Sequence, residues 1–382
     1  MIDRAPSAAL PAEAGTGNRL PRRIIMTVDA VGGVWRYALD LAEALRDAGV
    51  ETVFAGLGPG PSAEQRREAA RIGTLEWLAA PLDWMVDDES GLDAVPALLA
   101  ELALKRSVDL LHLNLPSQAA GLAVEMPVVA VSHSCVATWF DAVRGSGLPR
   151  DWLWQKRRNR QGFVRADVVL APSRSHAAAL TRCYDRIDNL AVVYNSSRRP
   201  RSTTIKENFV FAAARWWDEG KNGAVLDQAA AHSRWPVVMA GACEGRNGQH
   251  LRIEHADCPG ELGHGRTMAL MARAATVVSP SIYEPFGLVP LEAARTGAAL
   301  VLADIATYRE LWEGAALFTD PRDPAALADI LNRLARDAAL RAELGRRARL
   351  RSGDFTVEAQ RDGVLEAYRR AMRKSPLLTA AE

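Results

Sequence analysis

The chain has 382 residues, of which 48% are hydrophobic and 24% charged, and its formal net charge is +1 at pH 7. This ordinary globular balance excludes a disordered or fibrous protein, and the near-zero charge argues against a protein that coats nucleic acid, which needs a large positive excess. The length suits two domains of roughly 150–190 residues each. Four cysteines without a CxxC pair predict neither a zinc site nor a disulfide framework, and a reducing cytoplasm is the simplest compartment.

Residues 1–20 are rich in Ala, Pro, Gly and Ser, and they lack both a basic start and an apolar core. We interpret them as a flexible leader and not as a signal peptide. No stretch of the chain approaches 18 uninterrupted apolar residues, so the sequence predicts no transmembrane helix.

The first predicted domain covers residues 21–197 and has a Rossmann-like pattern. A β-rich run at 23–28 is followed by helical apolar spacing from Val34 and by a second β-rich run at 51–55, which together predict a strand–helix–strand unit. Further short apolar strands are predicted at 110–113, 127–131, 168–171 and 190–194, with helices at 95–105, 152–165 and 174–182. Six strands with interleaved helices predict one doubly wound domain.

A polar and basic linker is predicted at 198–208, after which the alternation of strands and helices starts again. The second predicted domain, 209–355, has strands at 209–213, 236–240, 275–278 and 299–302, and helices from about residue 222 and at 266–274, 288–296, 324–338 and 339–350. Residues 356–382 are interpreted as a C-terminal helix that crosses back to the N-terminal domain, followed by a polar tail. The predicted fold class is therefore α/β, with two doubly wound domains facing a central cleft and ligands beyond the carboxyl ends of the strands.

The segment 279–292 carries the strongest signal for a site. A predicted strand ends there, the following loop carries Glu284, and a helix opens next to Gly287 with a second carboxylate at Glu292. The unpaired N–H groups and the positive dipole end of a helix start suit a phosphate, and glycine lets the backbone approach it closely. The alternative is a solvated loop glutamate beside a helix glutamate that only complements the dipole.

Two cationic side chains come earlier in the second domain. Arg215 follows the predicted strand 209–213, and Lys221 comes six residues later. Arginine offers a rigid fork of donors and lysine a point charge, a combination that suits the neutralisation of a diphosphate. The alternative is a surface pair that interacts with Asp218 and Glu219.

Arg215, Lys221, Glu284, the turn Phe286-Gly287-Leu288 and Glu292, in this order, resemble the donor domain of the family 4 (group 1) glycosyltransferases, which have the two-domain GT-B architecture. The resemblance implies that Arg215 and Lys221 clamp the diphosphate of a nucleotide sugar together with the backbone amides of the turn. It also implies that Glu284 contacts the sugar and that Glu292 holds the ribose hydroxyls.

Three more positions match the family more loosely. His264, in Leu262-Gly263-His264, stands where the family's base-contacting loop lies, and Gly32-Gly33 resembles its glycine loop, where backbone approaches the phosphates and the acceptor. His133 matches the family's histidine near the donor sugar, although the family usually follows it with Asp and this chain has Ser134-Cys135. The alternatives are a simple tight turn at the glycines and a structural loop role for His133.

The resemblance implies retaining transfer of a sugar from a nucleotide-diphosphate sugar to a hydroxyl of a glycan or another acceptor, in polysaccharide or glycoconjugate biosynthesis. Cationic side chains and the helix start would stabilise the departing diphosphate, which can itself accept the acceptor's proton. No Asp-x-Asp motif is found, and we expect neither a metal nor a cofactor besides the donor substrate. Two alternatives remain: a GT-B-fold nucleotide-sugar epimerase, which needs no acceptor, and a nucleotide-sugar-binding protein without turnover. A nicotinamide-dependent oxidoreductase is disfavoured because Gly32-Gly33 is not a GxGxxG fingerprint.

Aromatic and basic side chains gather around the predicted helix 152–165. Trp139, Phe140, Trp152 and Trp154 precede a run of lysine and arginine at 156–160. We interpret them as a core-packing aromatic face with a solvated basic face. The alternative is peripheral contact of 152–165 with an anionic membrane surface, at the inner face of the cytoplasmic membrane. The oligomeric state is not predicted.

Overall fold

The computed structural model describes residues 19–198, 204–245 and 248–374. Almost all of the predicted leader 1–20, the middle of the predicted linker 198–208 and the end of the predicted tail lie outside the described residues. The chain divides into two compact units. The first comprises Met1–Asp141, Ser146–Asn195 and Val357–Glu382, and the second comprises Ala142–Gly145 and Ser196–Thr356.

The first unit contains a parallel seven-stranded sheet with the strand order β3-β2-β1-β4-β5-β6-β7. Its strands are β1 (Arg23–Val28), β2 (Glu51–Gly56), β3 (Thr74–Trp77), β4 (Leu110–Leu113), β5 (Val128–Val131), β6 (Val168–Ala171) and β7 (Leu190–Val192). Its helices are α1 (Gly33–Asp47), α2 (Ala63–Ala70), α3 (Val95–Lys105), α4 (Val136–Arg144), α5 (Leu153–Arg165), α6 (Arg174–Tyr184) and α13 (Val357–Lys374). The sheet has one strand more than the six predicted, because β3 lies at the edge with no fully buried residue and therefore lacks the apolar run of an interior strand.

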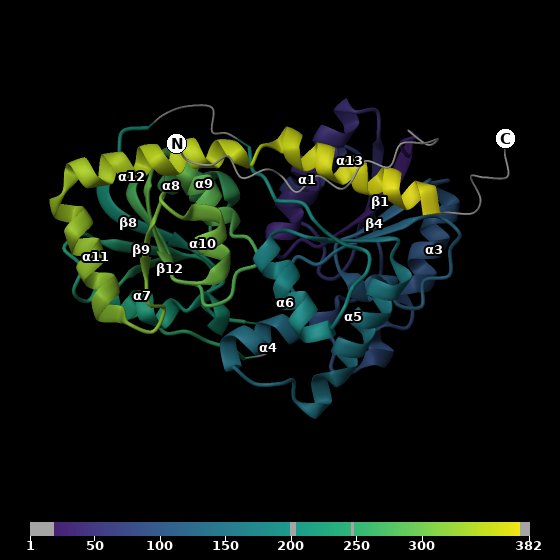
Figure 1. Ribbon diagram of the computed structural model, residues 1–382, viewed down its shortest axis with the longest axis horizontal. Coiled ribbons are helices and arrows are strands. Elements are labelled where there is room, and N and C mark those ends of the chain that lie inside the picture. Colours follow the sequence, from purple (N-terminus) through teal and green to yellow (C-terminus); the bar gives the residue numbers. More distant parts are fainter. Residues whose placement is uncertain (1–18, 199–203, 246–247, 375–382) are drawn as a thin grey trace. The chain divides into compact units, whose positions relative to one another are not determined.

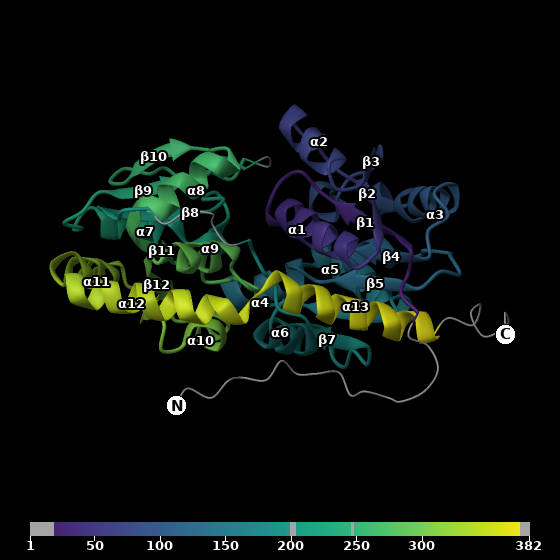
Figure 2. The same cartoon turned by 90° about the horizontal axis from the view of Figure 1, so that it is seen from above.

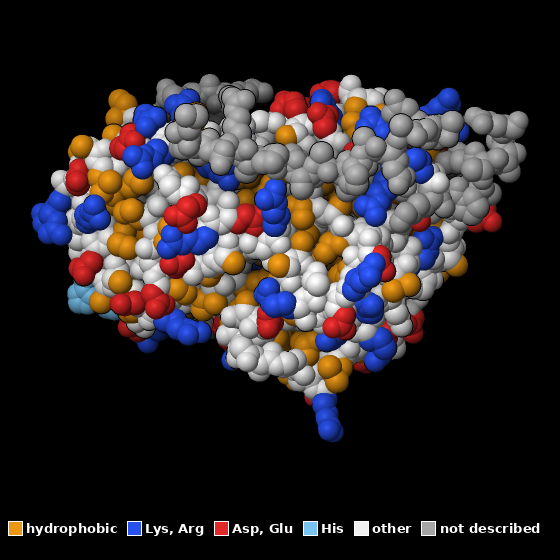
Figure 3. All heavy atoms as spheres, viewed as in Figure 1, with side chains coloured by type: hydrophobic (Ala, Val, Ile, Leu, Met, Phe, Trp, Pro, Cys, Tyr) orange, Lys and Arg blue, Asp and Glu red, His pale blue; other side chains and the backbone are white. Residues whose placement is uncertain are grey.

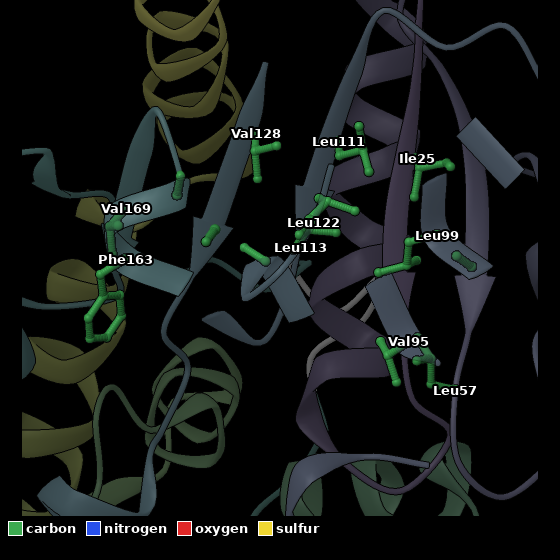
Figure 4. Packing of buried hydrophobic residues seen from close by; sticks show 14 of the residues in the cluster. Ile25, Leu57, Val95, Leu99, Leu111, Leu113, Leu122, Val128, Phe163 and Val169 are labelled. Carbon is green, nitrogen blue, oxygen red and sulfur yellow. The ribbon is translucent and has the colours of Figure 1, made fainter. Parts of the chain in front are cut away.

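Alternate residues of these strands supply two separate hydrophobic cores, one on each face of the sheet. Ile25, Leu111 and Val169 point to the face that α3 and α5 cover, where Leu99 and Phe163 pack against them (Figure 4). Ile24 and Leu110 belong to the opposite core, which α1 and α13 cover. Because both faces are buried, the interior strands are continuously apolar, which is the pattern that made them predictable.

Helix α13 packs next to α1 on the first unit (Figures 1 and 2). Its residues Val364, Tyr368 and Ala371 are fully buried together with Ala38 and Leu41 of α1. The last helix of the chain is thus part of the core of the unit that contains the first strand.

The second unit contains a parallel six-stranded sheet with the order β10-β9-β8-β11-β12-β13. Its strands are β8 (Glu207–Ala213), β9 (Val237–Ala240), β10 (Asp257–Gly260), β11 (Ala274–Ser279), β12 (Ala299–Ala303) and β13 (Leu317–Thr319). Its helices are α7 (Gly223–Ala230), α8 (His264–Arg273), α9 (Leu288–Thr296), α10 (Ala306–Trp312), α11 (Pro324–Arg336) and α12 (Ala338–Arg351). Helices α7, α11 and α12 bury one face of the sheet through Leu226, Leu331 and Leu344. The predicted α/β class is confirmed in both units.

In the second unit, the structure differs from the prediction at strands β8, β10 and β13. Strand β8 begins at Glu207, inside the predicted linker. Its first residue is exposed and forms an ion pair with Arg273 next to β11, so the start of the strand has no apolar pattern. Strand β10, which contains Pro259, is largely exposed, and β13 is only three residues long, so neither shows an interior pattern.

The surface carries both charge signs. On the face in Figure 3, Lys and Arg side chains are interspersed with Asp and Glu over the described residues, as the net charge of +1 leads one to expect. None of the helices in the described part of the chain has both the length and the apolar character to cross a bilayer.

Candidate active site

The site of the second unit lies where the strand order reverses. Strands β8 and β11 are neighbours in the sheet, but β9 follows β8 on one side and β12 follows β11 on the other. In an open parallel sheet, the crevice beyond the carboxyl ends of two such strands is the usual place for a ligand. The predicted residues Arg215 and Lys221 follow β8, and Glu284 and Gly287 follow β11.

The side chains of Lys221 and Glu284 meet at this point. Lys221 Nζ donates to Glu284 Oε2 over 2.7 Å, although the residues are 63 positions apart. The two side chains are 16% and 18% exposed, so the ion pair is largely shielded from bulk water. A lysine ammonium has three donors, and the pair with Glu284 uses one of them and fixes the direction of the others. Lys221 thus pairs with Glu284, whereas the Arg215 guanidinium lies 4.0 Å from Asp218, as the alternative interpretation expects for that residue.

Backbone contacts hold the loops of this pair together. The carbonyl of Gly220 accepts hydrogen bonds from the N–H groups of Ile282 (2.9 Å) and Tyr283 (3.2 Å). Asn222, with a left-handed φ of 57°, donates its side-chain amide to the carbonyls of Pro280 (3.0 Å) and Pro321 (2.6 Å). Asparagine tolerates this conformation better than most residues. The sequence analysis did not identify Asn222, although its position between Lys221 and a glycine was a usable turn signal.

Gly287 forms the entry to α9 in a conformation that requires glycine. Its φ is +90°, and a Cβ there would lie 3.0 Å from Tyr308 Cε1 and 3.3 Å from Glu284 Cγ. The first N–H groups of α9 have no partner within the helix, so the helix start presents donors and the positive dipole end beside Glu284. This is the arrangement that the sequence predicted for an anion.

Two buried aromatic rings support this turn from behind. The Phe286 ring is 3% exposed and packs edge-to-face on Phe355, with centroids 5.7 Å apart, so only its backbone can contribute to a ligand site. The Tyr308 hydroxyl is 2.5 Å from Ser279 Oγ, and burial, with the nearby Glu284 carboxylate, raises the pKa of Tyr308, which keeps it protonated. Tyr308 was not predicted, because α10 lacked a clear pattern.

The other predicted donor residues lie on the loop after β8 and on helices α8 and α9. Arg215 is half exposed, with its guanidinium 5.4 Å from the Trp217 ring centroid and 4.0 Å from Asp218. Glu292 is in the second turn of α9, which begins at Leu288, and it is partly buried. His264 is the first residue of α8 and is exposed. Nothing in this geometry tests their contacts to a donor, so these assignments stay predictions.

In the first unit, His133 is held in place by two neighbours. Its Nε2 is 3.0 Å from Asn114 Oδ1, and its ring meets the Tyr37 ring edge-to-face with centroids 4.3 Å apart. Burial lowers the pKa of His133 to about 3, with the nearby His112 and His176 adding to the shift, so the imidazole is neutral near pH 7. Asn114 and Tyr37 were not predicted, because only the neighbouring ends of β4, β5 and α1 bring them together.

The hydrogen bonds of Asn114 also define the proton position on His133. Asn114 Nδ2 donates to the carbonyl of Thr27 over 2.6 Å, and a carbonyl can only accept. Asn114 Oδ1 therefore faces His133, and Nε2 of the neutral imidazole must be the donor. The lone pair then resides on Nδ1.

The glycine loop directly precedes helix α1. Gly32 has a φ of 178°, an extended value that any residue adopts, so its backbone conformation does not itself require glycine. Gly32 and Gly33 are both exposed at the start of α1, where the absence of side chains leaves the backbone accessible.

The aromatic and basic segment is largely used within the first unit. Trp154 is buried, and the Arg158 guanidinium, 6% exposed, donates to the carbonyls of Ser117 (3.3 Å) and Leu92 (3.0 Å). Arg160 donates to two carbonyls at the end of α6 and beyond it. Trp152 and Leu153 remain exposed. The expected aromatic core contact is therefore found for Trp154. The expected solvated basic face is not found for Arg158, because its guanidinium is buried.

Within the described ranges, no group of three or more His, Cys, Asp and Glu side chains is placed to hold a metal ion.

Known proteins resemble this chain over both units. Residues 31–196 match the family model of Glycosyltransferase Family 4, and residues 198–351 match that of the Glycosyl transferases group 1. A glycogen synthase of Mycobacterium tuberculosis is 37% identical over 393 aligned residues, covering 90% of this chain and 92% of that protein. A D-inositol 3-phosphate glycosyltransferase of Frankia alni is 43% identical over 103 residues, which cover 26% of this chain and 25% of the relative.

Solved structures share the fold at low identity. Sucrose-phosphate synthase from Thermosynechococcus elongatus has a TM-score of 0.74 and 18% identity, covering 94% of this chain and all of that one. HepE of Anabaena in complex with UDP-glucose has a TM-score of 0.71 and 19% identity, covering 90% of this chain and 98% of that one. These structures show the GT-B architecture, and the two family matches with the relative that covers 90% of this chain establish that it belongs to the group 1 (family 4) glycosyltransferases.

Proposed function

We propose that this glycosyltransferase retains the anomeric configuration of a sugar that it moves from a nucleoside-diphosphate sugar to an acceptor hydroxyl. The observation that carries the proposal is the Lys221–Glu284 ion pair beside the start of α9, at the point where the strand order of the second sheet reverses. The pair sets an ammonium group next to unpaired helix N–H groups, and this combination suits a diphosphate.

The proposed reaction develops negative charge on the leaving diphosphate. The bond between the anomeric carbon and the phosphate oxygen breaks, and the acceptor oxygen forms a new bond to the same face of that carbon. The departing phosphate oxygen takes the acceptor's proton, so the protein need not supply a base. Lys221, Arg215 and the start of α9 stabilise the charge, a role that makes a metal ion unnecessary in this proposal.

The remaining site residues are assigned by the family resemblance. Glu284 contacts the transferred sugar and Glu292 holds the ribose hydroxyls of the nucleotide, while the turn at Gly287 offers backbone amides to the phosphates. His264 belongs to the loop for the base. The same resemblance assigns the donor sugar to His133, whose neutral imidazole donates from Nε2 to Asn114.

The comparisons support a glucose donor and a polysaccharide acceptor. The relative that covers 90% of this chain is named a glycogen synthase, and the Anabaena structure contains UDP-glucose. We therefore propose glucosyl transfer in polysaccharide biosynthesis, with the choice among uridine, adenosine and guanosine diphosphates decided by experiment.

A location in the cytoplasm follows from this proposal, because nucleotide sugars for polysaccharide assembly are handled there. The exposed side chains of Trp152 and Leu153 are the candidates for a peripheral membrane contact, whereas the buried side chain of Arg158 cannot contribute to it. Sedimentation with vesicles containing anionic lipid at low salt tests this contact, and absence of binding would remove it.

The test of the function is a product assay with donor and acceptor varied separately. UDP-glucose, ADP-glucose and GDP-glucose are each incubated with the protein, with and without glycogen, and products are identified by NMR. Growth of an α-linked chain from an α-configured donor is the expected result. An isomeric nucleotide sugar formed without acceptor would instead identify an epimerase, and tight nucleotide binding without turnover would identify a binding protein.

A further inference from the structure

Two thiols of the second unit lie together although their sequence spacing gives no hint of it. Cys243 follows β9, and Cys258 lies in β10. Their Sγ atoms are 3.2 Å apart and their positions differ by 15. A disulfide bond measures about 2.05 Å, so the sulfurs need to approach by only about 1 Å. The chain as described has both thiols free.

Backbone hydrogen bonds hold the segment of Cys243, and strand pairing on both sides of Cys258 holds the other thiol near it. The carbonyl of Cys243 accepts from Leu251 N–H over 2.9 Å, and the preceding carbonyl, of Ala242, accepts from Trp216 N–H over 2.8 Å. Cys258 lies between two pairs of the β9–β10 ladder, Asp257 opposite Val238 and Gly260 opposite Ala240, where the register shifts. The backbone of β9 and β10 therefore holds the two thiols close together, and rotation of the side chains can supply most of the remaining approach of about 1 Å between the two Sγ atoms.

The end of β9 is itself constrained next to the thiols. Gly241 has a φ of +131° and donates to the carbonyl of Gly260 over 2.9 Å. A Cβ at Gly241 would lie 1.8 Å from the carbonyl oxygen of Ala214. The strand end thus cannot move away from β8 or β10 without breaking several contacts, which keeps Cys243 close to Cys258.

The two thiols differ in their access to solvent. Cys258 is exposed, whereas Cys243 is partly buried. Burial raises the pKa of Cys243 to about 12, and the adjacent Cys258 and Glu244 add to the shift. A reagent from solution therefore meets Cys258 first, and Cys243 is placed behind it as the second thiol.

We propose that Cys243 and Cys258 form a modification site that low-molecular-weight disulfides, such as oxidised glutathione, convert reversibly into an intramolecular disulfide. The Cys258 thiolate attacks one sulfur of the reagent and releases one thiol. Cys243 then attacks Cys258 Sγ in the mixed disulfide, and the second thiol leaves. In total the protein loses two hydrogen atoms and is oxidised, and one reagent disulfide is reduced to two thiols. The site is independent of the proposed function.

The expected product is a cross-link within one chain. The full-length protein is treated with oxidised glutathione, and intact mass spectrometry should show the loss of two hydrogen atoms, reversed by excess reduced glutathione. Peptide mapping without reduction should join the peptide of Cys243 to that of Cys258. Because the bond closes a loop of about 15 residues, oxidation should also raise the melting temperature of the second unit by roughly 5 °C.

Matched serine variants separate this site from general thiol chemistry. Cys258→Ser should abolish both the mass loss and the melting shift, and since Cys258 is exposed this variant should fold normally. Cys183→Ser removes a partly buried thiol of the first unit and should react as the wild type does. Glutathione adducts without an internal cross-link, a cross-link that maps to any other pair, or no reaction at all would each overturn the proposal.

Discussion

Replacing Lys221 with methionine separates the structural role of its ion pair from its role toward the donor. The variant keeps most of the volume of the side chain but removes the ammonium group that donates to Glu284 over 2.7 Å. The matched variants are Glu284→Gln and the double variant Lys221→Met/Glu284→Gln, in which no charge is left unpaired.

The size of each effect follows from the geometry. At 2.7 Å and an effective dielectric constant of 20, the Coulomb attraction is about 6 kcal/mol before desolvation is subtracted. Both side chains are less than one fifth exposed, so Lys221→Met leaves a shielded carboxylate unpaired and should reduce the free energy of unfolding by about 2 kcal/mol. The double variant should recover most of that loss. Lys221→Met and the double variant both lack the ammonium group beside the leaving diphosphate, on which negative charge develops. Their kcat should therefore fall by a factor of about 10² to 10³.

Three measurements on the four proteins test this reasoning. Urea unfolding gives the stability, calorimetry gives the nucleoside-diphosphate affinity, and initial rates of sugar transfer give kcat. Affinity should fall roughly tenfold to a hundredfold in the Lys221 variants, because a charge-assisted hydrogen bond is lost. If the double variant regained affinity and transfer along with stability, the pair would be purely structural and Lys221 would not touch the donor.

Three further predictions concern the two units separately. Gly287→Ala should destabilise the second unit and weaken nucleotide binding. Gly297, at the other end of α9, has a φ of +78°, close to that of Gly287, but a Cβ there would have no atom within 4 Å. Gly297→Ala should therefore lower the free energy of unfolding only by the backbone strain of about 1 kcal/mol and leave the nucleotide affinity measured by calorimetry unchanged. Burial lowers the pKa of His112 to about 3 in the folded protein. Between pH 6.5 and about 3 the imidazole is therefore protonated in the unfolded chain but not in the folded one, so the free energy of unfolding falls as the pH drops through this range. In His112→Gln the slope of the unfolding free energy against pH, measured by urea titration between pH 4 and 6, should decrease by about 1.4 kcal/mol per pH unit, and an unchanged slope would contradict the assigned neutral state. Asn114→Ala removes the acceptor of His133 Nε2, so kcat should fall while calorimetric nucleotide affinity stays within twofold; an equal loss in both would show that the variant acts through the fold.

Much of the fold could be predicted because burial leaves a local pattern. Strand β1, helix α3 and helix α9 occupy the predicted residues, since interior parallel strands are apolar on both faces and these helices have clear starts and ends. Strands β3 and β10 escaped prediction because an edge strand is paired on one side only and is partly solvated, so its sequence is not constrained to be apolar.

The candidate site could be predicted only in its local parts. The turn at Gly287 was recognisable because the glycine, the following helix and the nearby glutamate lie within a few residues of one another. The support of that turn by Tyr308, and the holding of His133 by Asn114, could not be read from the sequence, because those partners belong to other strands and helices. Motif reasoning thus named candidate ligand residues, but it missed the residues that hold them in place.

The sequence by itself determined the alternation of strands and helices, the helix start at Gly287 and the family to which the chain belongs, since each depends on neighbouring residues in a fixed order. Only the tertiary structure decided which distant side chains meet. Lys221 reaches Glu284 because β8 and β11 are adjacent, and Cys243 reaches Cys258 because β10 pairs with β9. Strand order is set by packing across the whole sheet, and no local pattern in the chain records that order.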